Sequence, residues 1–287
     1  MEKKTQINGV ALHYTLEGPQ AAPVVTFCHS LAADSTLWAL QRRALASTYR
    51  VLCFDWRGHG GSDSSPGPYT FEQLADDARA LLAKLGIDRT HFVGMSMGGM
   101  VGQVLALRSP EILSSLTLCD TTAMMPKDRA ASWDAKIAAA STDFESLVGP
   151  AVDVFLPKGF SESHPEVVEM VKTMFRRTSP EGYIACAHPI RDFNVIERLH
   201  EIRVPTLVVV GEQDMGTPVP ASKAIAERIP GARLHVLANA AHLSNLAQPD
   251  EFNRVIGAFI AEVSEHALAG QLVAVQRDHP TNHVRPK

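Results

Sequence analysis

One serine stands in a glycine-rich string where a predicted strand gives way to a predicted helix. The string Gly94-Met95-Ser96-Met97-Gly98 follows the apolar run His91–Gly94 and opens the helical pattern Met97–Arg108. Small residues two positions either side of the serine let the backbone turn sharply and push its hydroxyl into the open. A hydroxyl presented in this way is suited to nucleophilic attack. Ser96 is therefore the predicted nucleophile.

A serine hydroxyl needs a base to take its proton and an acid to orient that base. After a strand–turn–helix serine of this kind, the acid and then the histidine follow along the chain. Asp214 comes after the apolar run Thr206–Val210 and Gly211, at the carboxyl end of a predicted strand. His242 lies in the loop after the last predicted strand and before the final helix. We expect Ser96, His242 and Asp214 to form a catalytic triad.

Two other acids could orient the histidine. Glu212 lies in the same turn as Asp214, and Asp120 follows the strand-like run Leu116–Cys119. Both stand near the carboxyl ends of predicted strands, where the sites of open parallel sheets form. Asp214 is favoured because it follows the glycine turn and should point along the top of the sheet.

A tetrahedral intermediate needs two N–H donors for its negatively charged oxygen. The first expected donor is the backbone N–H of Met97, the residue after the nucleophile. The second should come from the loop after Val24–Cys28, with the Leu31 N–H favoured and the Ser30 N–H as the alternative. His29, in the same loop, is expected to brace it by hydrogen bonds.

The string Asp55-Trp56-Arg57-Gly58-His59 places three ionisable residues close together. A catalytic role is conceivable for such a cluster, but the glycines favour a structural connection. We expect Asp55 and Arg57 to pair with each other and shape the wall of the site.

These residues must be positioned by an α/β fold. Short β-rich runs alternate with longer amphipathic stretches, a pattern typical of a mostly parallel sheet flanked by helices. An Asn8-Gly9 turn predicts an opening antiparallel hairpin. The eight predicted strands are Thr5–Ile7, Ala11–Thr15, Val24–Cys28, Val51–Phe54, His91–Gly94, Leu116–Cys119, Thr206–Val210 and Leu234–Leu237. The predicted helices are Ser35–Ala46, Thr70–Leu85, Met97–Arg108, Ser222–Ile229 and Glu251–Val263.

The alternation breaks between Ala123 and His200, a stretch rich in Ala, Met and charged residues. We interpret it as a helical cap, residues 123–200, inserted into a core formed by residues 1–122 and 201–265. The C-terminal tail, residues 266–287, ends in a polar string and is expected to be peripheral.

Composition excludes several classes of function. Of the 287 residues, 45% are hydrophobic and 20% are charged, which suits a globular protein with a large core. The formal net charge is -4 and no Lys/Arg stripe stands out, so nucleic acid is not an expected partner. A signal peptide, a membrane helix and a metal-binding cysteine spacing are not expected either. We expect a cytoplasmic protein that acts on a small-molecule substrate and needs no cofactor; the sequence does not predict its oligomeric state.

With these motifs in hand, the chain resembles the α/β-hydrolase superfamily over about residues 5–265, and within it the 3-oxoadipate enol-lactonases. The strings that carry the resemblance are Asp55-x-Arg57-Gly58-His59-Gly60-x-Ser62, Pro66-x-Pro68-Tyr69-Thr70, Gly94-x-Ser96-Met97-Gly98-Gly99-Met100, Pro180-Glu181-Gly182-Tyr183 and Ala241-His242-Leu243-Ser244-Asn245. The resemblance implies an α/β-hydrolase fold with an inserted cap and hydrolysis of a small lactone or ester through an acyl-enzyme.

Two departures from those enol-lactonases border the expected substrate site. Their cap commonly carries Pro-Arg-Trp-Phe where this chain has Pro157-Lys158-Gly159-Phe160, and their oxyanion loop usually reads Ser-Leu-Gly where this chain has Ser30-Leu31-Ala32.

Trp133 and Tyr183 are candidate substrate contacts. A lactone that carries a carboxylate would also need a cationic anchor, for which Arg191 is the first candidate. The alternative for Arg191 is a structural role that holds the cap together through a pair with Asp192 or another acid. The other candidates are Lys158, Arg176 and Arg177.

Other functions fit the same motifs. A C–C bond hydrolase of ring-cleavage products and a general carboxylesterase use a similar serine and triad. A binding module on this fold is disfavoured because every member of the triad is present.

Overall fold

A single eight-stranded sheet forms the centre of the protein in the computed structural model, which describes residues 2–277. The strand order is β1-β2-β4-β3-β5-β6-β7-β8. The first hairpin is antiparallel and β2 pairs antiparallel with β4, whereas all later pairs are parallel. The predicted fold class is confirmed. The strands are β1 (Glu2–Ile7), β2 (Val10–Glu17), β3 (Val24–Cys28), β4 (Arg50–Phe54), β5 (Thr90–Met95), β6 (Leu113–Cys119), β7 (Thr206–Gly211) and β8 (Arg233–Leu237).

Local sequence explains where these elements begin and end. Asn8 and Gly9 both have positive φ, as a two-residue hairpin turn requires, and they join β1 to β2 as predicted. Thr70 caps the helix that follows it by accepting a hydrogen bond from the N–H of Gln73. Gly86 ends the same helix with a φ of +67°.

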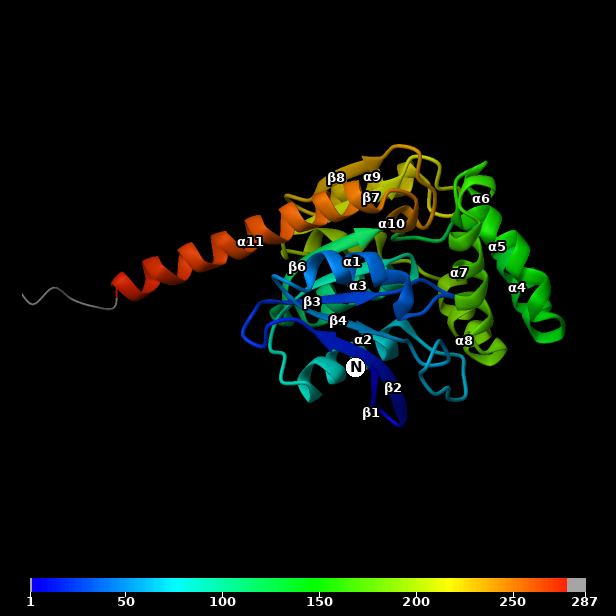
Figure 1. The fold of residues 1–287 in the computed structure, drawn as a ribbon, viewed down its shortest axis with the longest axis horizontal. Helices are drawn as coiled ribbons and strands as arrows, with labels where there is room; N and C mark the ends of the chain where they lie inside the picture. Colours follow the sequence, from blue (N-terminus) through cyan, green and yellow to red (C-terminus); the bar gives the residue numbers. More distant parts are fainter. Residues whose placement is uncertain (1, 278–287) are drawn as a thin grey trace, which may run out of the picture.

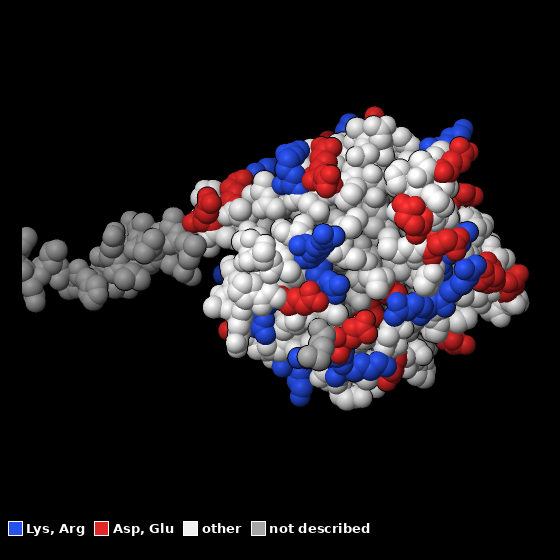
Figure 2. All heavy atoms as spheres, viewed as in Figure 1, with Lys and Arg blue, Asp and Glu red and all other residues white. Residues whose placement is uncertain are grey.

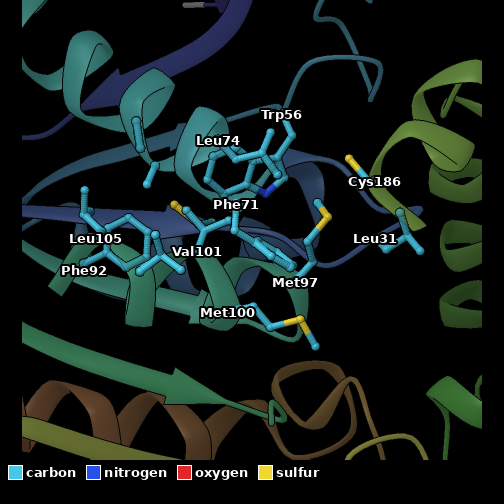
Figure 3. Packing of buried hydrophobic residues seen from close by; sticks show 14 of the residues in the cluster. Leu31, Trp56, Phe71, Leu74, Phe92, Met97, Met100, Val101, Leu105 and Cys186 are labelled. Carbon is cyan, nitrogen blue, oxygen red and sulfur yellow. The ribbon is translucent and has the colours of Figure 1, made fainter. Parts of the chain in front are cut away.

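Helices cover both faces of the sheet and create two hydrophobic cores (Figure 1). One core lies under α2 (Phe71–Lys84), α3 (Met97–Arg108) and α9 (Val219–Arg228), and Figure 3 shows Phe92 of β5 beside Val101 and Leu105 of α3. The other core lies under α1 (Ala39–Leu45) and α11 (Pro249–Arg277). A short helix, α10 (Ser244–Ala247), precedes α11.

The segment between β6 and β7 is helical and gathers at one end of the molecule (Figure 1). The bonds Met125 N to Phe193 O and Val195 N to Ala123 O join its two ends. We propose that the cap comprises residues 123–200. Its helices are α4 (Ala130–Thr142), α5 (Val148–Phe155), α6 (Phe160–Ser163), α7 (Pro165–Arg176) and α8 (Pro180–Arg191), and short 3₁₀ turns occupy Lys127–Arg129, Phe144–Leu147 and Ile196–Glu201. Two further 3₁₀ turns, Ser35–Trp38 and Pro110–Ile112, lie outside it.

The last helix is longer than the sequence pattern indicated. We expected it to end at Val263, but α11 continues through Arg277 and projects from the body of the protein (Figure 1). The expectation of a peripheral tail over residues 266–287 falls partly on this helix, and residues 278–287 lie outside the described residues. No helix within residues 2–277 combines the length and apolar character needed to cross a bilayer.

Charged side chains are mixed on the face of the molecule drawn in Figure 2, where Lys and Arg lie among Asp and Glu. That face carries no continuous basic stripe of the kind that binds nucleic acid.

Candidate active site

Ser96 occupies a strained turn between β5 and α3. Its backbone has a φ of 52° and a ψ of -111°, a left-handed φ that a non-glycine residue seldom adopts. The neighbouring glycines are required for space: a Cβ at Gly94 would overlap the carbonyl group of Gly98, and a Cβ at Gly98 would overlap the carbonyl oxygen of Cys28. The close approach of these backbone segments explains the glycine–serine–glycine string, and it leaves the hydroxyl of Ser96 at the edge of a cavity.

Three side chains from distant parts of the sequence form a continuous hydrogen-bonded chain. The Oγ of Ser96 lies 2.9 Å from Nε2 of His242, and Nδ1 of His242 lies 2.9 Å from Oδ2 of Asp214. With the proton on Nδ1, the imidazole donates to Asp214 and can accept the proton of Ser96. The structure thus brings the three predicted residues together in the order that nucleophilic catalysis requires.

Asp214 is held by its own loop. Its Oδ1 accepts hydrogen bonds from the N–H groups of Gly216 (2.7 Å) and Thr217 (2.9 Å), and its Oδ2 accepts one from Oγ1 of Thr217 (2.7 Å). Burial would raise the pKa of Asp214, but the charge and hydrogen bond of His242 and the bonds from Thr217 outweigh it and lower the pKa. The carboxylate is therefore ionised at neutral pH and oriented toward the imidazole.

The pairing with Asp214 raises the pKa of His242, whereas it lowers the pKa of Asp214. Burial would lower the pKa of His242, but the negative charge and hydrogen bond of Asp214 outweigh burial and raise it above the usual 6.5. His242 is thereby a stronger base than a free imidazole.

The two alternative acids make their hydrogen bonds to groups other than His242. Asp120 is fully buried and accepts hydrogen bonds from the Gly211 N–H (2.8 Å) and from Oγ of Ser244 (2.5 Å). Burial and the negative charge of Asp214 raise the pKa of Asp120 to about 8. Glu212 is exposed, with its Oε2 3.5 Å from the backbone N of Asn239. Geometry therefore favours Asp214 as the partner of the imidazole.

The two predicted oxyanion donors come from the start of α3 and from the loop after β3. Met97 opens α3, and the first N–H groups of a helix have no acceptor within it. Leu31 lines the cavity beside Ser96. His29 braces this loop, as expected: its Nδ1 lies 2.8 Å from the Ser30 carbonyl oxygen, and its Nε2 accepts a hydrogen bond from the Trp56 N–H (3.1 Å). A bond to the Ser30 carbonyl fixes the peptide plane that carries the Leu31 N–H.

The expected pairing of Asp55 with Arg57 is wrong. Arg57 makes a buried bidentate ion pair with Asp77 of α2, at 2.7 and 2.8 Å. Asp55 instead lies 2.8 Å from Nδ1 of His13 and accepts a bond from the Gly61 N–H (2.8 Å). The side chains of Asp55 and Arg57 point in different directions from their tight loop. Each therefore pairs with a side chain of another element, Asp55 with His13 of β2 and Arg57 with Asp77 of α2.

A cavity of about 200 Å³ opens beside Ser96 and His242, between the core and the cap. Trp133 of α4 and Tyr183 of α8, both proposed as substrate contacts, lie in its wall. Most of the lining is apolar, as is usual for small-molecule sites. The apolar wall also includes Leu31, Ala32, Met100, Met125, Leu147, Ala151, Val154, Phe155, Phe175 and Ile190.

Arg191 does not line this cavity, which corrects the choice of cationic anchor. Its guanidinium makes ion pairs with Asp134 (2.7 Å) and Asp192 (2.8 Å) on the surface of the cap. Arg191 was chosen because it follows the Pro180-Glu181-Gly182-Tyr183 string in the sequence. Nearness in sequence does not show the direction of a side chain, and this one points away from the cavity. The other three candidates are also absent from the wall: Arg176 pairs with Glu145, Arg177 pairs with Asp34, and Lys158 is exposed.

The cations in the cavity wall are Lys136 and Arg129, which sequence reasoning missed. Nζ of Lys136 lies 4.5 Å from the centre of the Trp133 ring. Burial and the nearby charge of Arg129 lower the pKa of Lys136. A signal was present, since residues 129, 132, 133 and 136 follow the spacing of one helical face, and Trp133 was already a candidate.

Arg129 also contacts the loop that carries the acid. Its guanidinium donates to the carbonyl oxygens of Met215 (3.2 Å) and Gly216 (3.3 Å), and so ties the start of the cap to the Asp214 loop. Among the side chains that the structure describes, residues 2–267, no cluster of three or more His, Cys, Asp or Glu is arranged to hold a metal ion.

Comparison with known proteins agrees with this geometry. The alpha/beta hydrolase fold family matches residues 23–249. The 3-oxoadipate enol-lactonase 2 of Acinetobacter baylyi is 34% identical over 250 residues, which cover 87% of this chain and 92% of that protein. The enol-lactonase from Burkholderia xenovorans LB400 is 32% identical, with a TM-score of 0.87 over 90% of this chain and 100% of the other. A hydrolase from Pseudomonas aeruginosa PA01 is 35% identical, with a TM-score of 0.86 over 90% of this chain and 98% of the other. The chain therefore belongs to the alpha/beta hydrolase fold family, and it is a hydrolase.

Proposed function

We propose that this hydrolase opens a small lactone or cleaves a small carboxylic ester through an acyl-enzyme on Ser96. The observation that carries the proposal is the chain of hydrogen bonds from Ser96 through His242 to Asp214 at the wall of a small-molecule cavity. A hydroxyl, an imidazole and an ionised carboxylate in this order are what acyl transfer to serine requires.

The reaction begins with attack of the Ser96 oxygen on the substrate carbonyl carbon, while its proton passes to Nε2 of His242. The Asp214 carboxylate stabilises the imidazolium that forms. The oxygen of the tetrahedral intermediate accepts hydrogen bonds from the N–H groups of Leu31 and Met97, and two such donors contribute several kcal/mol to lowering the barrier.

Collapse of this intermediate breaks the bond between the acyl carbon and the leaving oxygen, and His242 returns the proton to that oxygen. In a lactone, the leaving oxygen stays attached to the acyl chain, so the opened product remains tethered to Ser96. A water molecule then attacks the acyl carbon while its proton passes to His242. The bond between the acyl carbon and Oγ of Ser96 breaks, His242 returns the proton to that oxygen, and the carboxylic acid departs.

A substrate that carries a carboxylate fits this cavity better than a wholly neutral one. Lys136 and Arg129 place two cationic side chains in an otherwise mostly apolar wall, where they can donate charged hydrogen bonds to a carboxylate. Two of the three relatives described above are enol-lactonases by name. An acidic enol-lactone similar to theirs is therefore the proposed substrate class, with no cofactor needed and the cytoplasm as the proposed compartment.

A panel of purified substrates tests this proposal: an acidic lactone, a neutral lactone, a neutral aryl ester and a vinylogous diketone. We expect hydrolysis of the lactones and the ester, with the highest kcat/KM for the acidic lactone. Preference for the aryl ester would make the protein a general carboxylesterase. Cleavage of the diketone in preference to all of them would make it a C–C bond hydrolase and would overturn the proposal.

A further inference from the structure

One short segment, Cys119–Thr121, is hydrogen-bonded to the proposed nucleophile and to the loops that carry the other two members of the proposed triad. The carbonyl oxygen of Cys119 accepts a hydrogen bond from the N–H of Ser96 (2.8 Å). Oγ1 of Thr121 donates to the carbonyl oxygen of the same serine (2.7 Å). Both backbone groups of the nucleophile are therefore held by the residues that flank Asp120.

Asp120 itself reaches the other two members. Its Oδ1 accepts a hydrogen bond from the N–H of Gly211, three residues before Asp214. Its Oδ2 accepts a hydrogen bond from Oγ of Ser244, two residues after His242. One carboxyl group thus joins the end of β7, which leads into the acid loop, to the start of α10, which follows the base.

The backbone around Asp120 is shaped for this role. Its N–H donates to the carbonyl oxygen of Val209 (2.8 Å), and its φ of 45° is a strained value for a non-glycine residue. The side chain is fully buried and does not line the cavity, so it cannot touch a substrate there. Strain of this kind persists only where surrounding contacts fix it, which points to a role in holding the site together.

The two loops that Asp120 joins lie in direct contact. The N–H of Gln213 donates to the carbonyl oxygen of Ala240 (2.8 Å). A Cβ at Gly211 would overlap the carbonyl oxygens of Ala240 and Ala241. Because the distance from His242 to Asp214 depends on how these loops meet, a small shift between them would disturb the imidazole.

We infer that Asp120 is a positioning residue of this site: its carboxyl group holds the Asp214 loop and the His242 loop together, and it does not serve as the triad acid. The inference rests on the proposed function, since it assigns a role relative to the proposed triad. The role requires hydrogen bonds and not a negative charge. A neutral carboxyl group also avoids a second buried charge beside Asp214, in agreement with its raised pKa.

Replacing Asp120 with asparagine or with alanine distinguishes a role that needs its hydrogen bonds from a role that needs its charge. The Oδ1 of asparagine can accept from the Gly211 N–H, and its amide can donate to Oγ of Ser244. We expect Asp120→Asn to keep kcat on a neutral aryl ester within about threefold of wild type, whereas Asp120→Ala should lower kcat about 10- to 100-fold with KM almost unchanged, because small misplacements of reacting groups are costly.

Ser244→Ala keeps the inference testable if Asp120→Ala fails to fold. It removes only the bond to the base loop, and kcat should fall about 3- to 10-fold on the same grounds. Ser115→Ala is the matched control, because it also removes a buried serine hydroxyl, which lies 2.8 Å from Nδ1 of His91 in the sheet. It should lower stability without changing kcat.

Labelling with a fluorophosphonate probe separates failure of this inference from failure of the proposed function. The probe reacts with an activated serine whatever the natural substrate. Wild type and Asp120→Asn should label rapidly, and Ser244→Ala should label more slowly. An unlabelled wild type would refute the serine mechanism itself. Rapid labelling of wild type and of Ser244→Ala at the same rate, or a loss in Asp120→Asn as large as in Asp214→Asn, would overturn the positioning role.

Discussion

The ring of Phe155, the last residue of cap helix α5, stacks on the imidazole of His242, with ring centres 5.6 Å apart and planes 22° from parallel. The carbonyl oxygen of Phe155 also accepts a hydrogen bond from the N–H of Leu243 (2.9 Å). The end of one cap helix therefore contacts both the proposed base and the residue that follows it. The cap in this arrangement contacts the proposed base as well as lining the cavity.

Removal of this ring should impair turnover of any substrate. We expect Phe155→Ala to lower kcat on a neutral aryl ester about 10-fold, because the imidazole loses a neighbour that restricts its orientation. Phe160→Ala is the matched control, since Phe160 stacks on His164 in the same cap, away from the cavity. Steady-state kinetics of the two variants test the idea. Equal losses would mean that the cap tolerates neither change and that Phe155 has no special relation to His242.

Asp214→Asn should preserve the shape of the acid loop but favour the wrong tautomer of His242. The expected loss in kcat is about 10³- to 10⁴-fold. Glu212→Gln, in the same turn but exposed, should leave the rate unchanged. If Asp214→Asn were mild and Asp120→Asn severe, the acid would be Asp120 and the assignment made here would be wrong.

Lys136→Met tests the proposed anchor for a carboxylate. We expect kcat/KM for an acidic lactone to fall by about 2 kcal/mol, close to 30-fold, through loss of a charged hydrogen bond. A neutral aryl ester should be hydrolysed at nearly the wild-type rate. Arg191→Met, which removes a cation outside the cavity, should affect neither substrate. An equal loss on both substrates after Lys136→Met would show that Lys136 supports the cap and does not select an acid.

The pH dependence should report the raised pKa of His242. The imidazole acts as a base only when it is neutral, so kcat/KM should fall as the pH drops through its pKa. Because Asp214 stabilises the charged form, the midpoint of this acid limb should lie above the usual 6.5. An NMR titration of the imidazole in Ser96→Ala should shift in the same direction. A midpoint below 6.5 in both measurements would mean that burial outweighs the influence of Asp214.

Periodicity and turn chemistry predicted much of the framework. The strand before Ser96 and the helix after it have clear hydrophobic patterns and glycine punctuation, and the order of serine, acid and histidine is the one that α/β-hydrolases share. The end of α11 was misjudged because residues 264–269 contain no glycine or proline to end a helix, although their pattern is less regular than that of the preceding turns.

Partners of long charged side chains could not be predicted in the same way. Arg57 pairs with Asp77 and Arg191 with Asp134, and each partner lies on an element that the sequence alone does not bring near. Lys136 lines the cavity because one face of α4 is turned toward it. The orientation of a cap helix depends on tertiary packing, which the sequence pattern does not reveal. The support of His242 by Phe155 depends on the same packing.

The rate of hydrolysis by Ser96→Ala tests the central claim most directly. Wild type and variant would be compared on the acidic lactone and the neutral ester, with circular dichroism to verify that the variant is folded. Because the turn accepts a smaller side chain, the fold should be retained while the rate falls by about 10⁴ or more. A folded Ser96→Ala variant that kept more than about a tenth of the wild-type rate would remove Ser96 from the mechanism, since loss of a true nucleophile costs far more than that.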